Sequence, residues 1–341
     1  MPIRFTFYLI VSIAMLVLPA AAHVGGGIVV GPDGNIYFVH TKRSQVMQMT
    51  PDGVVNVLAH GVFGTGERRQ SRFPQPHHLA IDDEGALYVA GDSGDGLWKI
   101  TPDGGSSYYW PPQPHWQTLS IGVLGDPFTI DASGNIYTVN HPTTEGPDRA
   151  EDPQHAQILK TSMDMRIEVL AGGDRGFADG VEGEARFGDL FKATLQMGPG
   201  GNLYVSEPYA LRLVTPEGKV STLAGSSTPG FVDGPGEEAR FDQITGISVT
   251  PEGIVYIADA MNQRIRKLGT DGVVTTLAGS GQRGARDGPP DAASFFWLVG
   301  IAVDKAGTLY AMEQTSKDSY AFAIRKITPD GTVSTLALFS E

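Results

Sequence analysis

Histidine and carboxylate side chains that could exchange protons or bind a metal recur at two positions of a segment that the chain repeats. The first position opens the segment: His78 stands there directly after His77, and Asp126 directly precedes the next copy. The second position closes the segment, and most copies carry a polar side chain there: His40, Asn140, Glu207, Asp259 and Glu313. Imidazoles and carboxylates that converge on one axis can bind a divalent cation or act as acid and base.

We expect both positions to lie near the central axis of the ring that the repeats form. Their side chains would then belong to a single site. The candidate ligand-binding residues are His40, His78, Asn140, Glu207, Asp259 and Glu313. The predicted metal ligands are His40 or His78 on one side and Glu207 or Glu313 on the other. The expected cation is calcium, zinc or magnesium, and Asp126 is the candidate catalytic base.

The carboxylates also have a purely structural interpretation. A repeated Asp or Glu after a strand can accept hydrogen bonds from backbone N–H groups of the following loop. We favour this interpretation for Asp259, which stands in an Ala-Asp-x-x-Asn turn. Successive residues of a strand point to opposite sides, so only one of His77 and His78 should face the channel. No histidine spacing matches a zinc-binding motif.

The repeated segment has the pattern of two strands joined by a glycine-containing turn. Apolar residues lead to the turn, and the second strand opens with an apolar residue followed by tyrosine. Six copies occur, at 27–40, 78–91, 127–140, 194–207, 246–259 and 300–313. Such a period of short strands predicts a closed ring of small sheets.

Each copy is followed by two further strands. Residues 263–280 show the alternation of a half-buried strand, and Thr-Pro-Asp/Glu-Gly elements have turn chemistry. The expected fold is therefore all-β, a six-bladed β-propeller of four-stranded antiparallel blades. The predicted blades are 25–61, 77–110, 125–172, 193–226, 245–280 and 299–338, within one domain spanning 23–341. No strand exchange between the first and last blades is expected, so side-by-side packing should close the ring.

The pattern G-I-A-V-D-x-x-G-x-L-Y, followed by R-I-R-K and V-x-T-L-A-G, resembles the NHL-repeat family of six-bladed propellers. The resemblance covers essentially the whole chain after residue 22. It implies the propeller fold, whereas its functional implication is broad because such propellers include both binding proteins and enzymes.

The linkers between blades repeat a second motif. Asp179 precedes Arg186 by seven residues, Asp233 precedes Arg240 likewise, and a third copy around Asp287 lacks the arginine. We expect each arginine to pin its loop on its own aspartate, because the pair recurs at blade junctions and not at one special place.

One face of the ring should carry the loops between second and third strands together with the blade-to-blade linkers. We call it the working face, since variable loops on a rigid scaffold commonly form sites. An acidic, proline-rich insertion at 141–155 could be a lid there or a tolerated surface loop. Trp110 and Trp116 in the linker after the second blade are candidate ligand-binding residues, and Phe295 and Phe296 are expected to wedge between blades.

The composition limits where the protein acts. An apolar run followed by Pro-Ala-Ala-Ala predicts a signal peptide at 1–22, hence a secreted or periplasmic protein without membrane insertion after cleavage; an uncleaved anchor is the alternative. The absence of cysteine excludes disulfides, thiolate zinc and a cysteine nucleophile. The formal charge of −13 disfavours nucleic acid as a partner.

Three functional hypotheses follow. The first is an exported propeller that binds a protein, peptide or saccharide on the working face. The second is a metal-dependent lyase or hydrolase at the channel mouth, because six-bladed propellers that the fold resembles include amidating lyases, lactonases and streptogramin lyases. The third is a structural partner in a larger assembly. The enzyme hypothesis is weakened because the chain has neither cysteines nor an early Glu-Gly-Pro-x-Trp motif.

Overall fold

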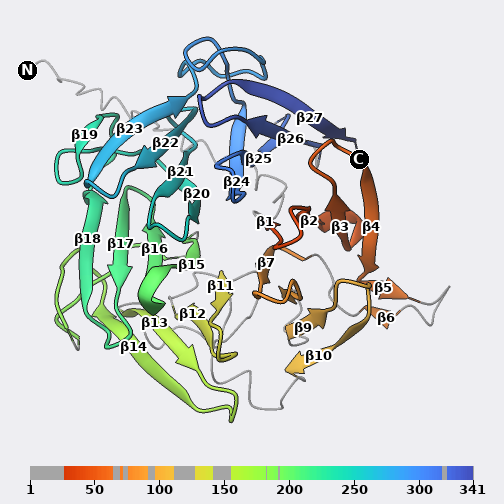
Figure 1. Ribbon diagram of the computed structural model, residues 1–341. Coiled ribbons are helices and arrows are strands. Elements are labelled where there is room, and N and C mark those ends of the chain that lie inside the picture. The colour runs from red at the N-terminus through yellow and green to blue at the C-terminus, as the bar shows by residue number, and fades with distance from the viewer. Residues whose placement is uncertain are drawn as a thin grey trace, which may run out of the picture.

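In a computed structural model of the chain, the described residues are 27–63, 70–71, 76–90, 97–110, 127–140, 155–181, 183–190, 193–316 and 321–340. They form six four-stranded antiparallel blades around a central axis, as the sequence predicts (Figure 1). In every blade the four strands follow one another in the chain, and the first strand lies innermost.

The strands have the following bounds. Blade 1 comprises β1 (Ile28–Val30), β2 (Ile36–His40), β3 (Gln45–Met49) and β4 (Val55–His60). Blade 2 comprises β7 (His78–Ile81), β8 (Leu87–Ala90), β9 (Leu97–Ile100) and β10 (Ser106–Trp110). Blade 3 comprises β11 (Phe128–Ile130), β12 (Ile136–Asn140), β13 (His155–Thr161) and β14 (Ile167–Asp174).

Blade 4 comprises β15 (Leu195–Met197), β16 (Leu203–Glu207), β17 (Ala210–Val214) and β18 (Val220–Gly225). Blade 5 comprises β20 (Ile244–Val249), β21 (Val255–Asp259), β22 (Arg264–Leu268) and β23 (Val273–Ala278), with the short β19 (Gly234–Pro235) added to its outer edge. Blade 6 comprises β24 (Trp297–Val303), β25 (Leu309–Gln314), β26 (Phe322–Ile327) and β27 (Val333–Phe339). A hairpin of β5 (Val62–Phe63) and β6 (Gln70–Ser71) and two 3-10 turns (Thr41–Arg43, Pro199–Gly201) complete the described structure.

The repeated turn explains why each copy forms a hairpin. Gly34 has φ +81°, a left-handed conformation that glycine adopts without strain. The hydroxyl of Tyr37 donates to Oδ2 of Asp33 at 2.7 Å, which ties the second strand to the turn. Tyr88 donates to Asp82 at 2.9 Å and Tyr137 donates to Asp131 at 3.0 Å, from aspartates that stand at the first position of their turns. In these three blades a local hydrogen bond therefore adds to core packing.

The hydrophobic core lies in layers between adjacent blades. Tyrosines, aliphatic side chains and linker phenylalanines fill these layers. Phe187, Phe241 and Phe295 are fully buried there, which confirms the wedge predicted for Phe295. Phe296 is only partly buried, and the Arg283 guanidinium lies 4.1 Å from its ring centroid.

Packing between blades 1 and 6 closes the ring without strand exchange. The ring of Phe38 in β2 meets Phe322 edge-on at 6.0 Å and Phe339 at 5.2 Å between centroids. Phe322 and Phe339 stack on each other at 4.6 Å. Residues near the end of the chain therefore take part in closure through the ring of Phe339.

The linker hairpins pair differently from the prediction. Asp179 does not bind Arg186: it accepts hydrogen bonds from Arg212 of β17 and from Thr222 of β18. Arg186 instead lies 3.5 Å from Asp174. The hairpin joins Ala178 and Arg186 through their backbones. The side chains of Asp179 and Arg186 therefore reach different partners.

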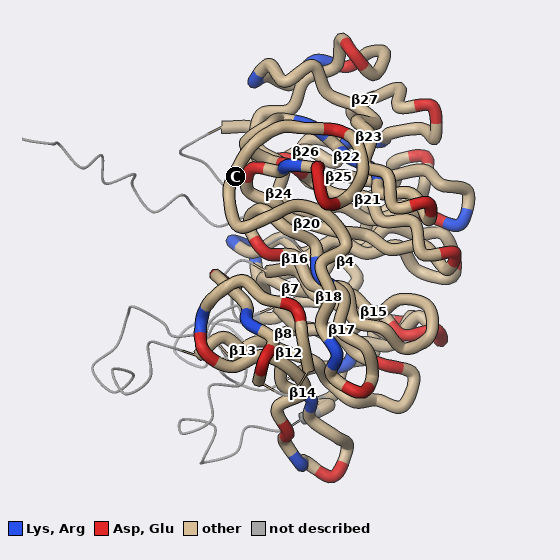
Figure 2. Tube along the Cα trace, turned by 90° about the vertical axis from the view of Figure 1, so that its left-hand side faces the viewer, with Lys and Arg blue, Asp and Glu red and all other residues tan. Residues whose placement is uncertain are grey.

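Seen edge-on, acidic and basic residues are interspersed along the described part of the chain (Figure 2). Over the same residues, no helix is long and apolar enough to cross a membrane. The predicted signal peptide at 1–22 lies outside the described residues and stays a prediction.

Candidate functional site

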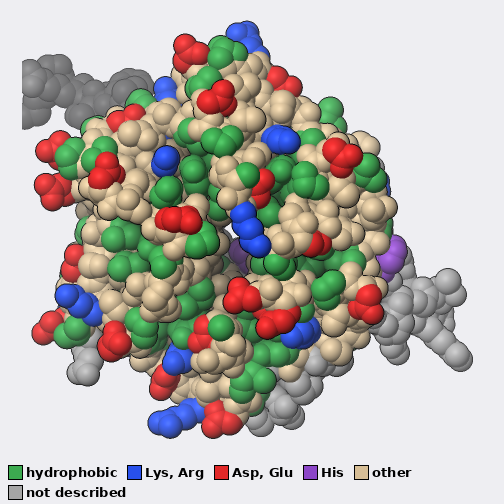
Figure 3. All heavy atoms as spheres, viewed as in Figure 1, with side chains coloured by type: hydrophobic (Ala, Val, Ile, Leu, Met, Phe, Trp, Pro, Cys, Tyr) green, Lys and Arg blue, Asp and Glu red, His purple; other side chains and the backbone are tan. Residues whose placement is uncertain are grey.

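A cavity of about 900 Å³ lies on the central axis and is lined by the innermost strands of all six blades. The hollow opens at the centre of the face shown in Figure 3, with a histidine visible in its depth and charged side chains at its rim. Its volume is in the range of small-molecule sites, which bury most of a ligand.

The walls of the cavity combine apolar side chains with polar groups. The aliphatic lining includes Ile28, Leu79, Leu195, Ile247, Val299 and Ile301. Uncharged polar or aromatic groups stand among them, namely Thr194, Gln196, Gln243, Thr245, Ser248 and Trp297. Charged residues of the lining lie in the turns after the first strands: Asp82, Asp83, Asp304 and Lys305. This is the composition expected of an organic-ligand site, with a few polar groups to orient the ligand.

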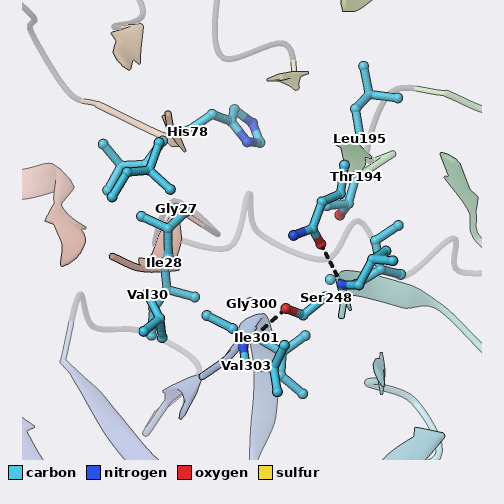
Figure 4. Close-up of a pocket in the computed structure, with 18 of the residues that line it drawn as sticks. Gly27, Ile28, Val30, His78, Thr194, Leu195, Ser248, Gly300, Ile301 and Val303 are labelled. Atoms are coloured by element: carbon cyan, nitrogen blue, oxygen red, sulfur yellow. Dashed lines mark hydrogen bonds between the residues drawn. The ribbon is translucent and has the colours of Figure 1, made fainter. Parts of the chain in front are cut away.

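Both neighbouring histidines belong to the cavity lining, and the expectation that only one imidazole faces the channel stays a prediction. Figure 4 shows the ring of His78 directed into the open space. His77 also supports the wall, since its carbonyl oxygen accepts a hydrogen bond of 3.0 Å from the N–H of Gly27. The first position of the repeat therefore reaches the axis as predicted.

The second position of the repeat does not reach the axis. Glu207 accepts a hydrogen bond from Arg212 Nη1 at 2.5 Å, and Asp259 accepts one from Arg266 Nη1 at 2.8 Å. Glu313 is paired with Arg325 in the same way. The second strand is one strand farther from the axis than the first, and its last side chain turns between blades to meet the third strand. These three carboxylates do not line the cavity, which corrects their predicted role as channel ligands.

Each of these arginines joins its blade to the preceding linker. Arg266 donates through Nε and Nη2 to Asp233, and through Nη2 to the carbonyl of Val232 at 2.8 Å. Its guanidinium carbon lies 5.2 Å from the ring centroid of Phe241. Arg212 and Arg325 repeat the arrangement in blades 4 and 6. We call the three units the arginine clamps.

Burial raises the pKa values of the clamp carboxylates. It raises the pKa of Asp259 to about 6, against hydrogen bonds from Asn262, from the backbone N–H of Asp242 and from Arg266. The pKa values of Glu207 and Glu313 are raised by burial as well. These bonds bear out the structural interpretation of Asp259, with the backbone donor coming from the preceding linker and not from the following loop.

His40 also lies outside the cavity. The residue is 2% exposed, and its ring meets Phe322 edge-on at 5.4 Å between centroids, in the seam between blades 1 and 6. Burial lowers the pKa of His40, and the neighbouring Arg43 and Lys42 act in the same direction. This imidazole is therefore a neutral part of the seam.

The remaining predicted residues are spread over different environments. Asn140 ends β12 and donates to Oε1 of Gln157 at 3.1 Å, within its own blade. Trp110 ends β10, and nothing is described of its side chain. Asp126, Trp116 and residues 141–154 of the insertion lie outside the described residues, and His155, its last residue, begins β13.

The four predicted metal ligands are not brought together. His78 faces the cavity, whereas His40, Glu207 and Glu313 point into seams between or within blades. Across the described part of the chain, no group of three or more His, Asp or Glu side chains is placed to hold a metal ion. The predicted divalent cation has no site among these residues and stays a prediction for the chain as a whole.

Sequence reasoning missed the residues that shape the cavity wall. Gln196 and Ser248 lie on innermost strands inside the repeated segments, whereas the prediction was confined to the first position of each segment. The buried arginines had a visible signal in the R-I-R-K pattern, which also indicated a half-buried strand and the family resemblance.

No protein-family model matches the chain. Among curated proteins, the chain is 33% identical over 84 residues to Protein SUPPRESSOR OF QUENCHING 1, chloroplastic, of Arabidopsis thaliana, covering 24% of this chain and 8% of that protein. It is 24% identical over 290 residues to Teneurin-m of Drosophila melanogaster, covering 69% and 10%. The chain thus spans 10% or less of either relative. Membership of the NHL-repeat family stays a prediction.

Solved structures share the fold. A Bacteroides thetaiotaomicron protein of unknown function aligns with TM-score 0.63 and 18% identity, over 90% of this chain and 69% of that one. An auxiliary nutrient binding protein of the same species aligns with TM-score 0.60 and 15% identity, over 92% and 70%. A streptogramin B lyase aligns with TM-score 0.51 and 17% identity, over 92% and 83%. At these identities the likeness shows the six-bladed propeller, which binding proteins and lyases share.

Proposed function

We propose that this protein is a ligand-binding propeller that takes a small organic ligand, most suitably a peptide, into its central cavity. The observation that carries the proposal is the apolar axial cavity of about 900 Å³, edged by His78, Thr194 and Trp297. Apolar walls favour an apolar side chain, and the sparse polar groups at the mouth would orient it.

The choice of a peptide over a saccharide rests on the lining. A saccharide would need many hydrogen-bonding side chains, together with flat aromatic surfaces. The described lining offers mainly aliphatic side chains and, among its aromatics, Phe128 and Trp297. A peptide combines apolar side chains with a polar main chain and fits this mixture better.

The runner-up is a lyase or hydrolase, with His78 as acid or base. It is favoured by one observation, the direction of the His78 ring into the cavity (Figure 4). The carboxylates that were expected to assist it are held in the arginine clamps. Binding without catalysis is therefore the stronger proposal.

The proposal is tested by a substitution that fills the cavity with a larger side chain. Thr194→Phe would place a ring in the cavity, whereas Thr270→Phe makes the same change in an exposed turn. The probes are pyrene, followed by its fluorescence, and the blocked tripeptide acetyl-Val-Ala-Val-methylamide, followed by calorimetry. We expect both to bind the wild type and the Thr270 variant and to lose at least tenfold in affinity for the Thr194 variant. Failure of both probes to bind the wild type would overturn the proposal.

A further inference from the structure

The peptide groups that face the cavity differ from blade to blade. In an antiparallel pair, residues alternate between those bonded to the partner strand and those whose N–H and C=O point away from it. In blade 1, Gly31 N–H donates to the Asn35 carbonyl at 2.9 Å, and Val39 N–H donates to the Gly27 carbonyl at 3.1 Å. The peptide groups of Ile28 and Val30, in alternate register with these bonds, therefore point away from β2 along the inner edge of the blade.

In blades 5 and 6 a side chain of the preceding blade occupies this inner edge. Gln196 Oε1 accepts from the N–H of Val249 at 2.9 Å, and Ser248 Oγ accepts from the N–H of Val303 at 3.0 Å. Both bonds cross from one innermost strand to the next, and Figure 4 shows them as dashed lines at the cavity wall. We call these side-chain acceptors caps. Each cap accepts a hydrogen bond from one backbone N–H that would otherwise face the cavity.

The register shows which residues take the capping position elsewhere. Gln196 and Ser248 each pair with the repeated tyrosine of their own blade, Tyr204 and Tyr256. The residue paired in this way in blade 6 is Ala302, which lies in the same packing layer as Val30. A methyl group cannot accept a hydrogen bond.

Apolar residues also occupy the capping position in blades 1 and 2. In blade 1 the tyrosine-paired residue is Val29, which packs with Ile81 of blade 2. In blade 2 it is Ala80. No hydrogen bond joins the N–H of Val30 or Ile81 to any other residue that the structure describes. Because Ile28, Val30 and Ile81 line the cavity, blades 1 and 2 present main-chain donors and acceptors to its contents.

We propose that the inner edge of β1, with the adjacent N–H of Ile81, hydrogen-bonds the main chain of an extended peptide in the central cavity. The inference rests on the proposed function and adds to it the groups that recognise the ligand. A strand edge binds an extended peptide through alternating N–H and C=O groups, while neighbouring pockets take its side chains. The apolar lining opposite, including Leu195 and Ile247, would contact those side chains.

Ala302→Ser tests this directly, since it copies at blade 6 the serine that caps the next blade from position 248. The new hydroxyl would accept from the N–H of Val30 and so compete with the ligand for that donor. Ala306→Ser, in an exposed turn of the same blade, is the matched control. One hydrogen bond corresponds to a change of roughly fivefold in affinity.

We expect Ala302→Ser to weaken the binding of acetyl-Val-Ala-Val-methylamide about fivefold, and to leave pyrene, which forms no hydrogen bonds, unchanged. The Ala306 variant should match the wild type with both probes. An unchanged peptide affinity in the Ala302 variant, or pyrene binding without peptide binding to the wild type, would overturn this inference and leave the proposed function standing. Loss of binding of both probes to the wild type would overturn both.

Discussion

Replacing Arg266 by leucine should destabilise the propeller strongly, because it leaves the buried Asp259 without its cationic partner. Arg266 and Asp259 are both 0% exposed, and their Nη1–Oδ2 distance is 2.8 Å. Removing one member of a buried ion pair costs about 3–5 kcal/mol. The carbonyls of Val232 and Arg240 that lose Arg266 still pair with each other's backbone N–H groups, so the isolated carboxylate accounts for most of the loss.

The chain contains its own design for a compensated variant. Blade 3 carries Leu159 at the strand irregularity where blade 5 carries Arg266, and it ends its second strand with Asn140 in place of Asp259. The double variant Arg266→Leu/Asp259→Asn therefore imitates blade 3. It removes the buried charge together with its partner, and it should recover at least half of the loss.

The measurement is the free energy of unfolding from urea titration, for the wild type, both single variants and the double variant. A loss below about 1 kcal/mol for Arg266→Leu would refute the assignment of the arginine clamps as structural ion pairs, since exposed pairs contribute that little. A double variant less stable than Arg266→Leu alone would refute the argument that the uncompensated carboxylate causes the loss.

Three further predictions concern acid, ring closure and metal. Hydrogen bonds from Thr222 and the charge of Arg212 outweigh burial and hold the pKa of Asp179 below its ordinary value of 3.8; its contribution is therefore present above pH 3.8 and lost as pH falls through the lower folded-state pKa. Asp179→Asn should cost about 1 kcal/mol or less at pH 7, with the difference from wild type shrinking below pH 4 in urea titrations, and an undiminished difference at pH 3 would contradict this. Phe339→Ala should cost about 1–3 kcal/mol by opening the stack on Phe322, whereas Leu338→Ala, 72% exposed, should cost little; equal effects would argue against aromatic closure. The predicted divalent cation is tested by elemental analysis and Tm before and after EDTA: near-stoichiometric calcium, zinc or magnesium whose removal lowers the Tm would support it, and a metal-free protein with an unchanged Tm would contradict it.

The architecture was predictable because each blade is encoded locally. The aligned tyrosine, the turn glycine and the Thr-Pro-Asp/Glu-Gly turns act over a few residues, so they can be recognised without knowledge of distant contacts. Repetition of that unit six times was enough to indicate a closed ring and to place the first strand at its axis.

The partners of the polar side chains were decided only by the tertiary structure. The sequence suggests that Glu207 and Asp259 are channel ligands. In the fold they point away from the channel, because each forms a buried ion pair with an arginine of the next strand. Asp179 and Arg186 are near in sequence yet choose different partners, since the hairpin that joins them directs Asp179 toward the following blade.

The sequence by itself determined the number of blades, their strand order and the apolar layers between them, since turns and alternation are short-range properties of the chain. The tertiary structure decided which residues reach the axis and which peptide groups remain exposed there. Those outcomes depend on side chains contributed by neighbouring blades, such as Ser248 opposite Val303 and Ala302 opposite Val30, and no local pattern records that pairing.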